Sequence, residues 1–125
     1  MRGAEVRTQT SDRGAVTAET AVALPVLVLF TVAMAWLVCV GITQVRAIDA
    51  AREVARAAAR SDSAGRAVSL GRQVAPPGSQ VSVQRGGDTV VATVRSPVRA
   101  PGGLLGGFAA VHVTGRAVAA QEPDQ

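Results

Sequence analysis

The hydrophobic and polar positions divide the chain into stretches with different periods. From Thr20 to Val45 no side chain is ionisable apart from Cys39, and most positions are apolar. A helix needs about 20 such residues to cross the hydrocarbon core of a bilayer. This stretch is therefore long enough to span a membrane, and Ala21–Thr43 is predicted to be the membrane helix.

The next stretch, residues 46–60, keeps a helical period and contains neither Gly nor Pro. The helix is therefore predicted to continue beyond the membrane as an amphipathic stalk. Apolar residues recur there at three- and four-residue steps, and the predicted stripe is Val45, Ile48, Ala51, Ala55 and Ala58. Opposite charges three residues apart are expected to pair as Arg46/Asp49, Asp49/Arg52 and Glu53/Arg56.

After Ser61–Gly65, which is predicted to end the helix, the pattern changes. Ala67–Val74 is expected to form a short second helix, closed by Pro76-Pro77-Gly78. Beyond it the period becomes two, which is typical of strands. The alternating apolar positions are Val81 and Val83, then Val90, Ala92 and Val94, then Val111, Val113, Gly115, Ala117 and Ala119.

The first two alternating runs are joined by Arg85-Gly86-Gly87-Asp88, which predicts a β-hairpin. Pro97, Pro101 and the segment Gly102–Gly107 are expected to form a loop before the third strand. The predicted fold class is therefore α+β: a long N-terminal helix, membrane-spanning and then amphipathic, packed on a small three-stranded antiparallel sheet. The stalk's apolar stripe is the expected cover for the sheet.

Composition narrows the functions that the chain can have. Its basic side chains are 13 arginines and one histidine, with no lysine, and aromatic residues make up 2%. With so few aromatics to stack on bases, nucleic-acid binding is not expected. No Ser/His/Asp set, phosphate loop or Cys/His cluster is present, so we expect no enzyme, no cofactor and no metal. Cys39 and His112 are interpreted as structurally ordinary.

The junction before the apolar run, Asp12–Glu19, allows three interpretations. A secretory signal peptide cut after Ala33-Met34-Ala35 would leave an exposed apolar start, whereas cleavage regions are normally polar. A lipoprotein cut before Cys39 is disfavoured by the bulky Val38. The third interpretation places the cut before the apolar run, between Gly14 and Ala15, so that the membrane helix is retained.

In this third interpretation the chain resembles type IV prepilins, which have a short charged leader ending in Gly and a Glu at the fifth mature position. Cleavage after Gly14 makes Glu19 that fifth residue. An unpaired carboxylate in hydrocarbon costs several kcal/mol, so it snorkels or finds a cation. The resemblance implies that the cation is the amine of a neighbouring subunit's Ala15, and that this pair fixes the axial register of the helices.

Two longer runs, residues 12–25 and 44–56, resemble the TadE-like pseudopilins of tight-adherence (Flp) pili. The chain lacks the Cys pair that some members carry in the soluble part. The resemblance implies a minor pilin or pseudopilin, with membrane lipid, a prepilin peptidase, other pilin subunits and assembly-platform proteins as partners. Pro25, which loosens the helix, Trp36, which faces a partner helix, and Gly41, which allows close approach, are the expected packing residues.

The implied domains are a leader over 1–14, a transmembrane helix over 15–45, its amphipathic continuation over 46–60 and a β-rich extracytoplasmic domain over 61–125 with a disordered tail. The implied location is the cytoplasmic membrane, crossed once with the C-terminal domain outside, and an extracellular pilus after incorporation. Charge does not choose this orientation, because arginines crowd both ends of the span. The alternative is an uncleaved single-pass envelope protein whose β domain binds a partner and whose Glu19 only complements the helix dipole.

Overall fold

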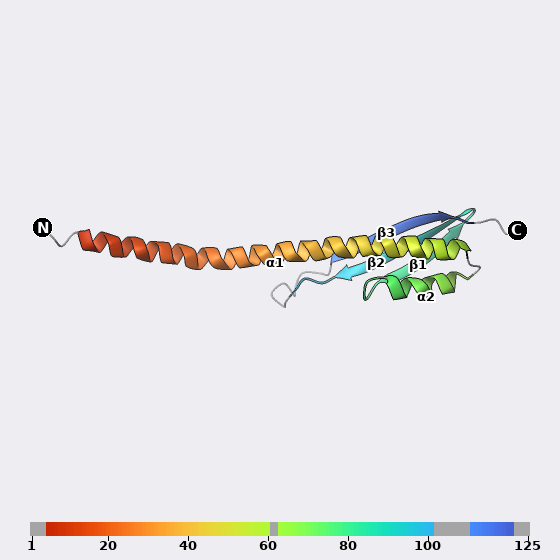
Figure 1. The fold of residues 1–125 in the computed structure, drawn as a ribbon, viewed down its shortest axis with the longest axis horizontal. Coiled ribbons are helices and arrows are strands. Elements are labelled where there is room, and N and C mark those ends of the chain that lie inside the picture. The colour runs from red at the N-terminus through yellow and green to blue at the C-terminus, as the bar shows by residue number, and fades with distance from the viewer. Residues whose placement is uncertain (1–4, 61–62, 102–110, 122–125) are drawn as a thin grey trace. The chain divides into compact units, whose positions relative to one another are not determined.

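The structure, a computed structural model, describes residues 5–60, 63–101 and 111–121, with side chains in these ranges from Arg13 onward. Its elements in chain order are α1 (Glu5–Arg60), α2 (Ala64–Val74), β1 (Gln80–Gly86), β2 (Thr89–Val98) and β3 (Val111–Ala120) (Figure 1). The chain divides into two units, residues 1–35 and 36–125. The predicted α+β class, a long N-terminal helix and a three-stranded antiparallel sheet, is confirmed.

The first unit is described as helix alone, and every side chain from Arg13 to Ala35 is exposed. α1 begins at Glu5, so residues 5–13 of the predicted leader are helical. Thr17 and Thr20 lie inside the helix. Their hydroxyls donate backward to the carbonyl oxygens of Arg13 and Val16, both at 2.9 Å, as residues inside a helix do. Extending a formed helix gains one hydrogen bond per residue, so helix can propagate into a leader without proline.

The second unit contains the sheet, whose strands pair in the order β1-β2-β3, all antiparallel. The predicted hairpin is confirmed: β1 and β2 turn at Gly87-Asp88, where Gly87 has a φ of 56° that favours glycine. The third strand is also confirmed. Gly102–Gly107, the centre of the expected loop, lies outside the described residues.

The end of β2 differs from the prediction, because Pro97 lies in the strand, opposite His112, and not in a loop. Pairing with β1 stops at Arg95, so beyond that residue β2 has a neighbour on one side only. A proline, which lacks an N–H to donate, is tolerated at such an edge.

The core of the second unit lies between α1 and the sheet. From α1 the buried residues are Ala47, Ala50, Ala51, Val54, Ala55 and Ala58, and from the sheet they include Val90, Ala92, Val94, Val98 and Val113. The predicted stripe was right for Ala51, Ala55 and Ala58, but Val45 is 58% exposed and Ile48 only half-buried. Small side chains take the contact face, since they let the helix lie closer to the strands.

Charged pairs line the outer face of this part of α1. Arg52 and Asp49 approach to 3.4 Å and Arg56 and Glu53 to 2.6 Å, so two of the three predicted pairs are present. Arg46 is not paired with Asp49. All four paired side chains are about half exposed or more, so each pair contributes only a few tenths of a kcal/mol.

The second helix, α2, starts three residues before the predicted Ala67. Ser63 explains the start, because its side chain accepts a hydrogen bond from the backbone N–H of Arg66 at 3.3 Å and so caps the first turn. Gly71 brings α2 close to its neighbours, since a Cβ there would overlap Val54 and touch Val81. The side chains of α1 and β1 thus set how near α2 can lie.

α1 approaches the sheet closely at Gly115 of β3. A Cβ at this position would overlap the backbone carbonyl of Ala47 and the backbone nitrogen of Ile48. Beside this contact, Nε2 of Gln44 donates to the carbonyl oxygen of Thr114 at 3.0 Å. Only glycine therefore allows α1 to pack this closely on β3.

We predict that Gly115→Val lowers the free energy of unfolding by at least about 2 kcal/mol, because helix backbone cannot rotate away from the new side chain as a flexible side chain would. Denaturant unfolding of the full chain in detergent, followed by fluorescence of the single tryptophan, measures this loss. Gly86→Val is the matched control: a Cβ at Gly86 of β1 meets nothing within 4 Å, so a change below about 0.5 kcal/mol is expected. Equal losses in both variants would contradict the close-packing role of Gly115.

Candidate functional site

The predicted cleavage point, Gly14–Ala15, lies on the exposed surface of α1. A Cβ at Gly14 would meet nothing within 4 Å, so no described side chain shields this peptide bond. The bond is helical, however, and a peptidase needs it extended. Gly14 eases this step, because glycine makes a helix interior about 1 kcal/mol less favourable than alanine does.

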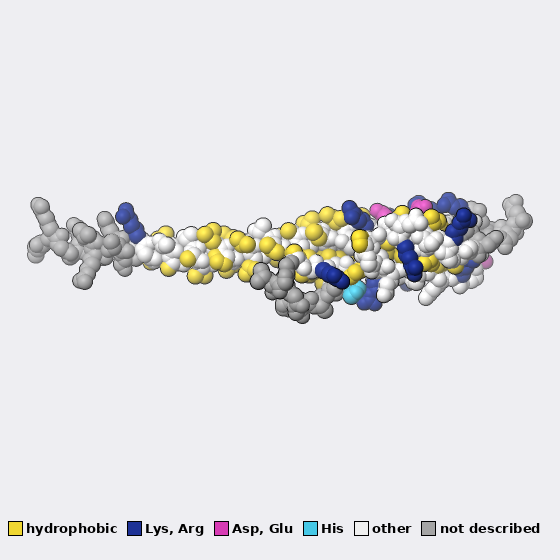
Figure 2. All heavy atoms as spheres, turned by 90° about the horizontal axis from the view of Figure 1, so that it is seen from below, with side chains coloured by type: hydrophobic (Ala, Val, Ile, Leu, Met, Phe, Trp, Pro, Cys, Tyr) yellow, Lys and Arg dark blue, Asp and Glu magenta, His cyan; other side chains and the backbone are white. Residues whose placement is uncertain are grey.

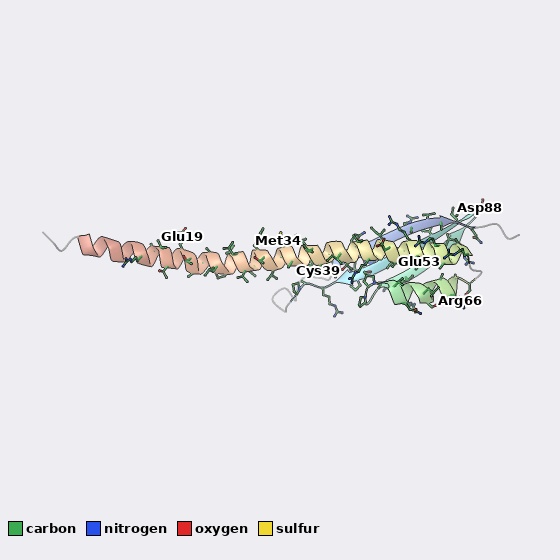
Figure 3. All side chains as sticks on the ribbon, in the orientation of Figure 1. Glu19, Met34, Cys39, Glu53, Arg66 and Asp88 are labelled. Carbon is green, nitrogen blue, oxygen red and sulfur yellow. The ribbon has the colours of Figure 1, made fainter. Side chains whose placement is uncertain are left out.

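Glu19 lies one turn further along the same helix and is exposed (Figure 3). The residues three and four positions away on either side are all apolar: Ala15, Val16, Val22 and Ala23. Arg13 is six positions away, or about 9 Å along a helix axis. With the described residues Glu19 makes no hydrogen bond or ion pair. Its carboxylate is therefore without a partner within the described chain.

Pro25 lies inside α1, which continues through it. Proline has no N–H, so the carbonyl oxygen of Ala21 loses its usual helical donor. The apolar side chains around it are exposed, among them Leu24, Val26, Leu27, Val28, Leu29 and Phe30. By length and composition, α1 is the one described helix that is apolar enough to cross a membrane.

The two other predicted packing residues, Trp36 and Gly41, lie in the second unit. Trp36 is half-buried and, with Val40, packs against the cluster formed by Ala47, Val98 and their neighbours. Its indole Nε1 is buried and has no described hydrogen-bond partner. Gly41 is exposed, with nothing within 4 Å of a Cβ. The structure thus assigns Trp36 a contact inside its own chain, and packing of both residues against another helix stays a prediction.

The sequence pattern identified Gly115 only as one position of an alternating strand and did not predict its contact with α1. The signal was available, because an isolated Gly on the buried face of a strand indicates close backbone approach. Within the described ranges no three His, Cys, Asp or Glu side chains lie close enough together to hold a metal ion.

A comparison with known protein families concerns the segment that contains these residues. Residues 14–56 match the family described as TadE-like protein. This match confirms the resemblance predicted from the sequence, and it covers Gly14, Ala15, Glu19 and the whole apolar run. It ends four residues before the C-terminal end of α1, so the sheet lies outside it.

A curated relative, named apoptosis inhibitor Rv3655c, comes from Mycobacterium tuberculosis and is 48% identical over 80 residues. The aligned part is 61% of this chain and spans only 60% of the relative's length. That name describes an activity of the mycobacterial protein. No solved structure matches the chain.

Proposed function

We propose that this protein is a minor pilin or pseudopilin of a tight-adherence pilus, processed after Gly14 and assembled by helix packing. The observation that carries the proposal is the TadE-like match over residues 14–56. It begins at the predicted cleavage residue and continues through Glu19 and the apolar run. In this proposal residues 1–14 are the leader, 15–45 cross the membrane, 46–60 continue the helix and 61–125 form the extracytoplasmic domain.

Processing is the first step. A prepilin peptidase removes the leader on the cytoplasmic side and leaves Ala15 with a free amine. The open surroundings of Gly14 and the low helix propensity of glycine both support access to this bond. The apolar helix stays with the mature protein, which keeps the protein in the membrane until assembly.

The second step is the axial alignment of neighbouring helices, which depends on Glu19. A helical Glu side chain leans toward the N-terminus, so in the mature subunit its carboxylate can reach the amine of its own Ala15, four positions earlier. On assembly that partner is exchanged for the amine of a neighbouring subunit's Ala15. Leaving the carboxylate unpaired in hydrocarbon costs several kcal/mol, so only registers that keep the pair are stable.

The exposed apolar side chains of residues 16–34 supply the packing surface in the third step. In the membrane they contact lipid, and in the assembly they contact other pilin helices and platform proteins. Gly41, with open space around it, supports close approach of such a helix. The β domain remains outside the cytoplasmic membrane and is available to other pilus components.

We predict that mass spectrometry of membrane-extracted protein, co-expressed with the prepilin peptidase, gives a mature N-terminus at Ala15. Gly14→Val should leave most of the protein with its leader, because the added side chain blocks close approach to the backbone. Gly41→Val is the matched control, since it places the same side chain at an equally open position of α1 and should be cleaved normally. An intact leader in the wild-type protein would instead favour an uncleaved single-pass envelope protein with a partner-binding β domain.

We further predict that Glu19→Gln is cleaved normally but is recovered in sheared pili at least about tenfold less than the wild type, a factor that corresponds to the loss of one partly desolvated charge pair. Quantitative immunoblotting of pilus and membrane fractions measures the ratio. Glu53→Gln is the control, because it neutralises an exposed carboxylate of α1 that is already paired with Arg56. Normal incorporation of Glu19→Gln would rule out the register role.

A further inference from the structure

A basic rim surrounds the end of the sheet domain where the apolar run finishes. The core contacts fix which end this is: Ala47 packs with Val98 and Val113, whereas Ala58 packs with Val90 and Ala92. The C-terminal end of β2 therefore lies beside Thr43–Ala47 of α1, and the β1–β2 turn lies at the opposite end. Any residue around Pro97 is consequently close to the place where α1 leaves the membrane.

Two hollows open at this end, and Gly78 and Pro97 line both of them. The larger, of about 490 Å³, is lined by both helix and strand residues and includes Arg46 and Arg99. The smaller, of about 280 Å³, includes Arg95 and His112. Gly78 has a φ of 77°, and a Cβ there would come within 3.3 Å of Pro97, so glycine keeps the turn between the hollows close to β2.

The rim carries positive charge, and among the described residues no Asp or Glu lines either hollow. In the described part of the second unit the acids are Asp49 and Glu53, which are paired with Arg52 and Arg56, and Asp88, in the turn at the far end of the sheet. Figure 2 shows dark-blue arginine side chains around the cyan histidine side chain on the face drawn. The rim is therefore built to attract anions.

We propose that this rim, formed by Arg46, Arg95, Arg99 and His112, docks the domain on the headgroups of acidic phospholipids. Membrane is the occupant that the surroundings favour, because Ile42 and Val45, on either side of Thr43 in the lining of the larger hollow, are apolar and 49% and 58% exposed. Arg46, one turn beyond Ile42 and directly after Val45, would lie at headgroup depth with its stem along the apolar surface. The proposal rests only on α1 entering a membrane, not on cleavage after Gly14 or on pilus assembly.

Docking would hold the domain against the bilayer through several arginines at once. Each arginine close to an anionic membrane surface strengthens binding by about fivefold. The attraction falls off within a Debye length, so high salt should release the domain. The rim thus regulates whether the domain is bound to its own membrane or free for other partners.

The test is hydrogen exchange of the full chain in nanodiscs of phosphatidylcholine alone or mixed with phosphatidylglycerol. We expect backbone amides of residues 78–80 and 98–100 to exchange at least about tenfold more slowly with phosphatidylglycerol, as two or more arginines at about fivefold each imply. Amides of the turn at Gly87-Asp88 should not change. Salt at about 0.5 M should remove the difference.

The double variant Arg46→Gln/Arg99→Gln should reduce the lipid-dependent difference to about fivefold or less, because only Arg95 of the three rim arginines remains. The matched control is Arg66→Gln/Arg116→Gln, which removes two exposed arginines outside the hollows and should keep it. Protection of the hairpin amides reports whether each variant is folded. Equal exchange in both lipids, or equal loss in both double variants, would overturn the proposal. Inorganic phosphate added to phosphatidylcholine discs should give no protection, and if it did the rim would be a site for free anions instead.

Discussion

The packing of α1 on β3 without intervening side-chain volume is the constraint on which the domain depends. Gly115 faces the backbone of Ala47, and the buried face of α1 is otherwise alanine with a single valine. Burial of a methylene contributes about 0.8 kcal/mol, so such small side chains each add little. The domain offsets this with a long row of buried side chains on α1, from Ala47 to Ala58, and with close backbone approach at Gly115. Because neither partner covers its apolar face alone, the helix and the sheet stabilise each other.

The periods of the sequence were enough to predict the elements and the fold class, because a helix and a half-buried strand place side chains at different intervals. They were not enough to predict which face of α1 is buried. Val45 and Ile48 are larger and more hydrophobic than Ala47 and Ala50, so hydrophobicity alone favours the wrong stripe. Closeness of approach decides the face, and it depends on a glycine 68 positions further along the chain. A contact between residues so far apart in the chain leaves no local pattern in the sequence.

The sequence pattern misplaced the start of α1 and the end of β2, and each error has a local physical reason. The helix extends back to Glu5, because residues that merely permit helix take that form when a stable helix follows. Pro97 can lie in β2 because β1 pairs with β2 only as far as Arg95. No carbonyl of β1 therefore needs an N–H from residue 97. The candidate site differs from the fold in this respect. Gly14, Ala15 and Glu19 were proposed from their spacing before an uncharged run, and the described contacts within the chain add little to that spacing. The proposed function places the partners of these residues in other molecules, which a single chain does not contain.

The two units therefore differ in how their apolar side chains are removed from water. Residues 36–121 have a core in which alanines and valines are almost wholly removed from solvent. From residue 13 to 35 every side chain is exposed, including a continuous apolar surface far larger than soluble monomers tolerate. That surface needs lipid or other helices, and a lone carboxylate at its start is the one group that can distinguish one axial position from another. A uniform apolar helix packs equally well in many registers. In the proposed function, a single charge at the first turn after the proposed cleavage point ties register to processing, because the amine proposed to pair with Glu19 exists only once the leader is removed.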